Sequence, residues 1–435
     1  MIPLQTYFPS ELQQMLKSPE TKVSDVLSLA YISKSTRIGF LEVIDYFSKH
    51  SKEILEYAFL DEKSIISTNA YAILCQSNER IIHPILEDSS FQNMATETLS
   101  NPNVPQFIIG RLSSLTLSFL IKMPEVATES CGFIYHLLKY CEDPGTFNFF
   151  ETICCGDEAF AYIHKWLNDI GFAEYLLREI DNIDFNYESH EKVVLKDKTY
   201  IKAVCFYKLM AKCCLNQILC NGFQNQHTVD VLSKNFPNEP VFVCNARWSA
   251  ISASTSKITA PFLLNKLFTK ALDLLNEQFE DLKEFRVSAL ELITKILTYA
   301  PLSFDLLLQT SMPQMLIHLV LKFPYSTFLH SAFLKFVQNG LKREDFALKI
   351  VGCYTPVIID IAEESNNRVL IPFCMKMLDM FLELSKTNKN VETMLKETSE
   401  LKSFIKGKMK KYKDITERPY GESSNGVAKM FMKLF

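Results

Sequence analysis

The apolar residues of this chain follow a helical pattern along most of its length. Apolar side chains return at intervals of three and four residues, which places them on one face of an α-helix. Alternation of apolar and polar residues, the pattern of a half-buried strand, is scarce, and the best short candidate, residues 241–243, is too short to build a sheet. The helical spacing is clearest at Trp166, Ile170, Ala173, Leu177 and Ile180, at Phe285, Ala289, Leu292, Ile296 and Leu297, and at Met315, Leu316, Leu319, Val320 and Phe323. The pattern therefore predicts an all-α chain.

Glycine and proline usage supports the same fold class. Only 12 of the 435 residues are glycine, well below the roughly 7% of an average protein, which disfavours tight hairpins and phosphate-binding loops. Many prolines fall between apolar segments or at their starts, where a helix tolerates them: Pro84, Pro102, Pro105, Pro124, Pro144, Pro261, Pro301, Pro313, Pro324, Pro356 and Pro372. Short helices with short connections, stacked in sequence, form an α-solenoid of HEAT or armadillo-like repeats of about 40 residues. Residues 300–340 fit one such unit.

The length of the chain leaves two options for its domain organisation. A chain of 435 residues exceeds what one hydrophobic core usually organises, so it forms either two or three domains or one elongated repeat array. We expect a single helical-repeat domain over residues 1–415 and a loosely ordered tail over 416–435. Two polar stretches, 181–199 and 221–259, are expected to interrupt the array, and the second to hold a long connection.

Charge and hydropathy exclude several classes of function. The net charge of −4 gives no basic face for nucleic acid. The apolar stretch 112–121 is shorter than the roughly 20 residues that span a bilayer, so no membrane insertion is expected. The N-terminal residues lack the basic and apolar regions of a signal peptide, and the 12 cysteines include no CxxC pair. We therefore expect a cytoplasmic or nucleocytoplasmic location, and cysteines that pack as thiols in helix cores.

Motifs that carry chemistry are missing from the sequence. It contains no glycine-rich nucleotide loop, no HExxH string, no nucleophile elbow and no histidine and cysteine spacing suited to a metal. We expect no enzyme activity, no cofactor and no metal. The lysines between Lys402 and Lys413 are the strongest local charge signal, and they are either a solvated helix end or a basic patch for an acidic partner or membrane surface.

Two short strings resemble a known protein family. In the first, Trp166-Leu167-Asn168 leads into an apolar helical segment. In the second, a leucine-rich stretch runs into residues 322–330 (KFPYSTFLH), where Lys322, Phe323, Phe328, Leu329 and His330 match a family string. Together they resemble the SAPS family, the regulatory subunits of protein phosphatase 6-type serine/threonine phosphatases. Tyr325 stands where that family has Trp, and Ser326-Thr327 where it has Asn-Asn.

The resemblance implies a non-catalytic scaffold that binds a serine/threonine protein phosphatase catalytic subunit and directs it to substrates, with a further substrate-recruiting subunit as a possible third partner. The alternative is another helical-repeat adaptor, for transport or for the cytoskeleton. The residues that the resemblance implies for partner binding are Trp166, Asn168, Lys322, Phe323, Tyr325, Phe328 and His330. Within 323–330, core packing and partner contact both stay open. We expect Phe328 and Leu329 to lie in the core and Tyr325 and His330 to reach outward.

Overall fold

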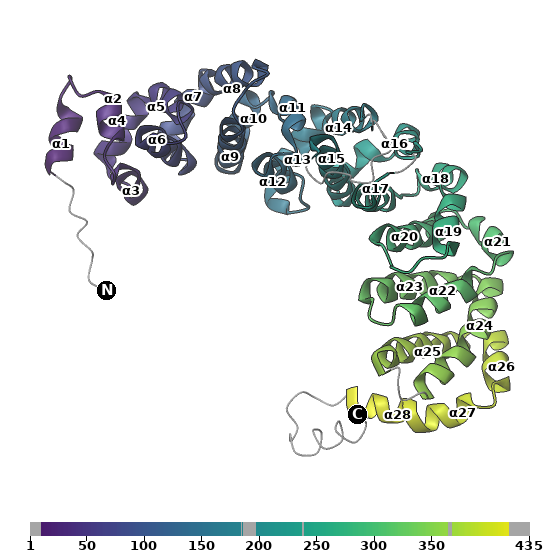
Figure 1. Ribbon diagram of the computed structural model, residues 1–435. Coiled ribbons are helices and arrows are strands. Elements are labelled where there is room, and N and C mark those ends of the chain that lie inside the picture. Colours follow the sequence, from purple (N-terminus) through teal and green to yellow (C-terminus); the bar gives the residue numbers. More distant parts are fainter. Residues whose placement is uncertain (1–9, 184, 186–196, 237–238, 364–367, 417–435) are drawn as a thin grey trace. The chain divides into compact units, whose positions relative to one another are not determined.

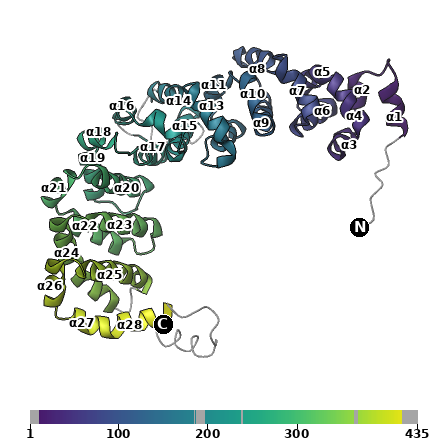
Figure 2. The same cartoon turned by 180° about the vertical axis from the view of Figure 1, so that it is seen from behind.

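The computed structural model describes residues 10–183, 185, 197–236, 239–363 and 368–416. Every regular element within these ranges is a helix, and no strand occurs among them (Figures 1 and 2). The prediction of an all-α chain is therefore confirmed. In the same ranges, no helix combines the length and the apolar content that crossing a membrane requires.

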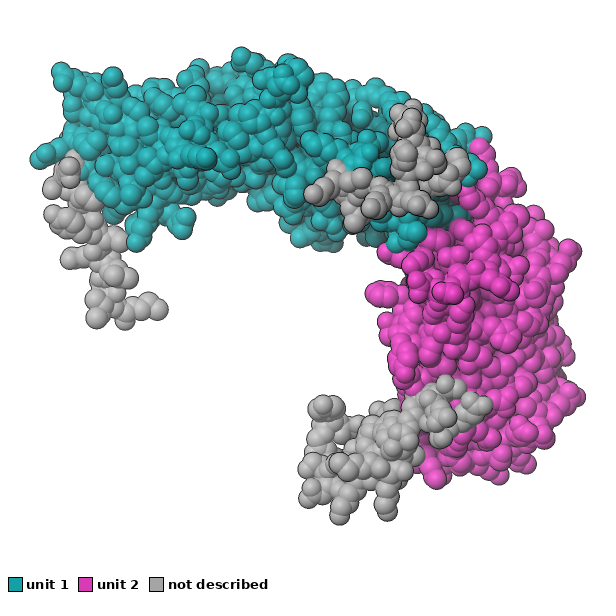
Figure 3. All heavy atoms as spheres, in the orientation of Figure 1, with its two compact units in different colours: residues 1–254 teal, residues 255–435 magenta. Residues whose placement is uncertain are grey.

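The chain divides into two compact units, residues 1–254 and 255–435 (Figure 3). The expectation of one repeat domain over 1–415 stays a prediction.

Unit 1 contains seventeen α-helices and three 3-10 turns in its described part. They are α1 (Ser10–Lys17), α2 (Val23–Leu27), α3 (Ile32–Ile38), α4 (Leu41–Lys49), α5 (Ser51–Ala58), α6 (Ile65–Cys75), α7 (Glu79–Glu87), α8 (Ser90–Ser100), α9 (Gln106–Lys122), α10 (Pro124–Ser130), α11 (Ile134–Leu137), η1 (Leu138–Tyr140), α12 (Pro144–Ile153), η2 (Glu158–Phe160), α13 (Ala161–Asp169), α14 (Phe172–Asp181), α15 (Lys198–Leu215), η3 (Leu219–Phe223), α16 (Gln226–Leu232) and α17 (Val241–Ala253). Helices α6, α9, α12, α15 and α17 pack in succession, and α4, α7, α10 and α13 form a second succession.

Unit 2 repeats this arrangement with α18 (Ala260–Lys266), α19 (Phe268–Asn276), α20 (Glu284–Tyr299), α21 (Ser303–Leu308), α22 (Met312–Lys322), α23 (Thr327–Gly340), α24 (Glu344–Glu363), η4 (Arg368–Leu370), α25 (Ile371–Ser385), α26 (Lys389–Glu397), α27 (Leu401–Phe404), the π-helical turn η5 (Ile405–Met409) and α28 (Lys410–Thr416). Helices α20, α23 and α25 lie side by side in one row, and α19, α22 and α24 in the other (Figures 1 and 2). Phe333 and Tyr354, from α23 and α24, are among the side chains that fill the core between the rows.

Side chains also connect neighbouring helical layers, as three hydrogen bonds show. Asn69 donates to the carbonyl of Leu27, 42 residues earlier, and Asn339 donates to the carbonyl of Thr294, 45 residues earlier. Lys408 donates to the carbonyl of Ala362, 46 residues earlier. Leu27 and Ala362 lie at the ends of α2 and α24, where the last carbonyls have no partner within the helix, so those two donors satisfy helix ends. Thr294 lies inside α20.

Three details of the sequence analysis need correction. The stretch 221–259 holds no long connection in its described part, because η3, α16 and α17 occupy most of it. The apolar spacing over 166–180 is split between α13 and α14, because Gly171 adopts a left-handed φ of 74° between them. Pro84 and Pro356 lie inside α7 and α24 instead of between helices.

The other expected interruption, 181–199, falls mostly on residues 184 and 186–196, which lie outside the described residues, as does the expected tail beyond residue 416.

Candidate functional site

Five of the seven residues predicted to bind a partner lie at the turn between α22 and α23 in unit 2. The turn forms because Pro324 cannot continue α22, so Phe323 leaves the helical conformation with φ −122° and ψ 62°. Ser326 then caps α23, its side chain accepting a hydrogen bond from the amide of Leu329. The end of α22 before Pro324 and the start of α23 after Ser326 thus fix where each side chain of the turn points.

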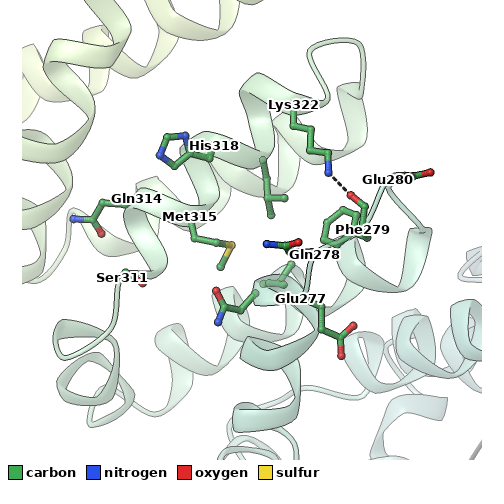
Figure 4. Close-up of a pocket in the computed structure, with 12 residues that line it drawn as sticks. Glu277, Gln278, Phe279, Glu280, Ser311, Gln314, Met315, His318 and Lys322 are labelled. Atoms are coloured by element: carbon green, nitrogen blue, oxygen red, sulfur yellow. Dashed lines mark hydrogen bonds between the residues drawn. The ribbon is translucent and has the colours of Figure 1, made fainter.

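Lys322 and Phe323 face the neighbouring turn between α19 and α20. The ring of Phe323 stacks on that of Phe279, with centroids 5.7 Å apart and planes 4° from parallel. The Lys322 ammonium donates to the carbonyl oxygen of Phe279 (Figure 4). The guanidinium of Arg286 lies 3.9 Å from the centroid of the Phe279 ring and pairs with Glu277 at 3.0 Å. Stacked aromatic rings and cations of this kind hold the two turns together.

Tyr325 and Phe328 point away from the protein. Each has 80% of its surface exposed, which places them among the most exposed large side chains of the described chain. The prediction that Phe328 belongs to the core is therefore wrong, whereas Leu329 is buried and Tyr325 reaches outward, as expected. Exposed aromatic side chains placed together make a surface suited to partner contact.

His330 turns inward instead of outward, which corrects the expectation for this residue. Its ring is half-buried and packs against Phe373 of α25, with centroids 5.0 Å apart. Its Nε2 atom is buried and has no hydrogen-bond partner. Burial lowers the pKa of the His330 imidazole, and a hydrogen bond with the backbone of Phe323 opposes that shift.

A cavity of about 800 Å³ adjoins the two turns in unit 2. The first face comes from α22 with Gln314, Met315 and His318, and the second from the α19–α20 turn with Gln278 and Glu280 (Figure 4). Neither this cavity nor the aromatic Phe279 beside it was predicted from the sequence. No local pattern could have found them, because Phe279 meets Lys322 across 43 residues of chain.

The remaining two predicted residues lie in unit 1. Trp166 is half-buried on α13, and Asn168 is exposed near the end of that helix. Asn168 lines a small cavity of about 140 Å³ with Glu174 and Phe223. The structure therefore brings Lys322, Phe323, Tyr325, Phe328 and His330 to one turn, and Trp166 and Asn168 to one helix.

The lysines of 402–413 are carried by α27, η5 and α28. Two of them have defined structural contacts: Lys408 donates to the carbonyls at the end of α24, and Lys413 pairs with Asp379 at 2.5 Å. Lys402, Lys406 and Lys410 are exposed.

The described residues contain no group of three or more His, Cys, Asp or Glu side chains arranged to hold a metal ion. The twelve cysteines are free thiols. Burial raises the pKa of Cys205 to about 11 and of Cys374 to about 12, which keeps both protonated at neutral pH and poorly nucleophilic.

Comparison with known proteins adds no family assignment. No protein-family model matches this chain, and no curated protein matches it in sequence.

Proposed function

We propose that this protein is a non-catalytic α-solenoid scaffold that binds other proteins. The regular spacing of contacts between layers supports the solenoid: hydrogen bonds join residues 42 to 46 positions apart at Asn69, Asn339 and Lys408. Two successions of helices, each packed on the one before, are the arrangement that HEAT and armadillo-like repeats adopt. A stack of about 40 residues per layer agrees with the period of such repeats.

The observation that carries the binding function is the exposed pair Tyr325 and Phe328. Leaving two large aromatic side chains 80% exposed gives the isolated protein little packing energy. Aromatic side chains of this kind are the residue types that dominate binding energy when a partner covers them. Phe323, at the start of the same turn, stacks on Phe279, whose ring also meets Arg286, so the turn that carries the pair is packed against its neighbour.

We propose that the partner is the catalytic subunit of a protein phosphatase 6-type serine/threonine phosphatase, which the scaffold directs to substrates. The support is the resemblance of residues 166–168 and 322–330 to the SAPS family. The proposal includes a cytoplasmic location and leaves room for a further substrate-recruiting subunit. A different helical-repeat adaptor, with a transport or cytoskeletal partner at the same turn, is the alternative.

The proposal is tested by measuring binding of the purified full chain to a purified phosphatase 6-type catalytic subunit by biolayer interferometry. We expect saturable binding that falls at least about tenfold, or about 1.4 kcal/mol, in the double variant Tyr325→Ala, Phe328→Ala. Leu302→Ala is the matched control, because Leu302 is 78% exposed and lies outside the α22–α23 turn. It follows the C-terminal end of α20, whereas Phe279 precedes the N-terminal end.

Absence of binding by the unaltered chain would refute the phosphatase partner. Affinity purification from the source cells then distinguishes the alternative: a small GTPase or a cargo protein that depends on Tyr325 and Phe328 would support an adaptor at the same surface. If the double variant and Leu302→Ala bind equally well, the α22–α23 turn is not the docking surface.

A further inference from the structure

The last helical stretch of unit 2 carries more positive charge than its contacts within the protein use. Helix α27, the π-helical turn η5 and α28 follow one another without a break from residue 401 to residue 416 (Figure 1). This stretch contains six lysines and one carboxylate, Asp414. Lys408 donates to the carbonyls at the end of α24, and Lys413 pairs with Asp379. The other four lysines are exposed, and no carboxylate of the described residues pairs with them.

Three of these exposed lysines form one row along the stretch. Lys402, Lys406 and Lys410 recur every four residues, and the buried side chains are Leu401, Phe404 and Met409. In an α-helix of 3.6 residues per turn, positions four residues apart drift by about 40° around the axis. The π-helical turn at 405–409 has more residues per turn and opposes this drift. The three lysines, called the lysine row below, therefore stay on one side and away from the core.

The helix itself does not account for the lysine row. The favourable effect of a cation on the helix dipole is confined to the last turn, and the last turn of α28 contains Lys413 instead. Like charges four residues apart disfavour the helix that carries them. Because the row has no counter-charge among the described residues, an external anionic surface that neutralises it would stabilise this part of unit 2.

The sequence that follows the described residues adds an independent feature, which is apolar. In residues 427–435 (VAKMFMKLF), the apolar residues recur at intervals of three and four, and the segment has two lysines and no carboxylate. The recurring apolar residues are Val427, Met430, Phe431, Leu434 and Phe435. Lysines combined with large apolar residues in this spacing are typical of segments that bind at a membrane interface. An acidic protein surface would neutralise the lysines but gives no reason for the apolar pattern.

We propose that the lysine row and residues 427–435 together bind the surface of a membrane that contains anionic lipids. The ammonium groups of the row meet the lipid headgroups, and the apolar residues of 427–435 enter the interface without crossing the bilayer. Lysine suits this role because it acts as a point charge and does not require the fixed geometry of an arginine pair. Two signals are needed because a single weak one gives only marginal membrane binding. The proposal does not depend on the phosphatase partner, which is assigned to the α22–α23 turn.

The test measures co-sedimentation of the full chain with lipid vesicles. One set of vesicles contains phosphatidylcholine with about 30% phosphatidylserine, and the other contains phosphatidylcholine alone. We expect binding to the anionic vesicles to be at least about tenfold tighter, and to weaken as the salt concentration rises. Equal binding to the two sets, or no binding to either, would overturn the proposal.

A triple variant tests the lysine row: Lys402→Gln, Lys406→Gln, Lys410→Gln. It should weaken binding to the anionic vesicles at least about tenfold. The matched control removes the same charge at three other exposed positions of unit 2: Lys335→Gln, Lys342→Gln, Lys389→Gln. The control should retain most of the affinity, and both variants should keep the Tm of the unaltered protein within a few degrees, because all six side chains are exposed. Equal losses of affinity in the two variants would show attraction by net charge alone and would refute the lysine row as the binding surface.

The double variant Phe431→Gln, Leu434→Gln tests the apolar contribution. Salt screens the lysines but not apolar burial, so the part of the binding that persists at high salt should be lost in this variant. Binding of soluble poly-glutamate provides the last comparison. If poly-glutamate binds as tightly as the anionic vesicles and the double variant has no effect on vesicle binding, the lysine row recognises an acidic protein and the membrane proposal is wrong.

Discussion

Arg247 and Glu239 form an ion pair that is almost completely buried in unit 1. The Nη2–Oε2 distance is 2.5 Å, and the side chains are 3% and 5% exposed. Arg247 also donates to the carbonyl oxygens of Leu232 and Lys234, which satisfies the end of α16. The pair raises the pKa of Arg247 despite the opposing effect of burial, so the guanidinium stays charged in the core.

Glu239→Gln should therefore destabilise unit 1 by about 3–5 kcal/mol, because it leaves Arg247 buried without its counter-charge. Urea unfolding followed by circular dichroism measures the change. Asp45→Asn is the matched control, since it breaks the Arg80–Asp45 pair, whose side chains are 63% and 58% exposed. We expect a loss of about 1 kcal/mol or less from the control, and comparable losses in both variants would contradict the stabilising role of the buried pair.

Two phenylalanines of α23 provide a second comparison. Phe333 is fully buried and Phe328 is 80% exposed. Phe333→Ala should cost about 3–5 kcal/mol of unfolding free energy through lost burial and a cavity, whereas Phe328→Ala should change it by only about 0.5 kcal/mol. Thermal and urea unfolding of the two variants checks this difference. A large loss from Phe328→Ala would show that the residue is structural and would remove it from the proposed docking surface.

The same residues show how far sequence reasoning reaches. The apolar spacing of Phe285 to Leu297 is long enough to fix both the helix and its buried face, and all five residues of that pattern are buried in α20. The face of α23 depends on its start at Thr327, which the structure places directly after the Ser326 cap. With that start, Leu329 and Phe333 point inward, and Phe328 falls on the other face. Local apolar content alone could not determine which of these residues face the core and which face outward.

The candidate functional site was predicted from the sequence less completely than the helices. Sequence reasoning identified the α22–α23 turn because the string 322–330 is continuous. It missed Phe279 as a site residue, since Phe279 acquires its role through contacts with Lys322 and Phe323 of another turn. Ser77 adopts a left-handed conformation, which its residue type does not predict, because glycine and asparagine are the residues that usually occupy such positions.

Gly222 lies where two elements of unit 1 approach closely. A Cβ atom added at Gly222 would lie 2.4 Å from the Cβ of Ala173, which cannot move without its backbone. Gly222→Ala should therefore destabilise the protein by about 1–3 kcal/mol, measured as a lowered urea midpoint. Gly132→Ala is the control, because nothing lies within 4 Å of its added Cβ. It should leave stability unchanged or raise it by about 0.4–1 kcal/mol, and equal losses at both positions would show that close packing is not the cause.

Stability should fall as the pH is lowered below about 6.5, the ordinary pKa of histidine, because burial lowers the pKa of both His164 and His330. A lowered pKa means that the folded protein binds fewer protons than the unfolded chain in this range, so protonation favours unfolding. The stabilisation is complete above pH 6.5 and is lost as the pH falls through the folded-state pKa values. Differential scanning fluorimetry between pH 7.5 and 5.5 should show a falling Tm.

The variant His330→Phe isolates the contribution of His330, in unit 2, to this pH dependence of Tm. It preserves an aromatic ring against Phe373 and removes the buried, unpartnered Nε2 atom. We expect a smaller drop in Tm between pH 7.5 and 5.5 than in the unaltered protein, whereas His318→Gln, at an exposed position on α22, should retain the full drop. If His330→Phe keeps the whole pH dependence, the imidazole of His330 is not among the groups that bind protons on unfolding.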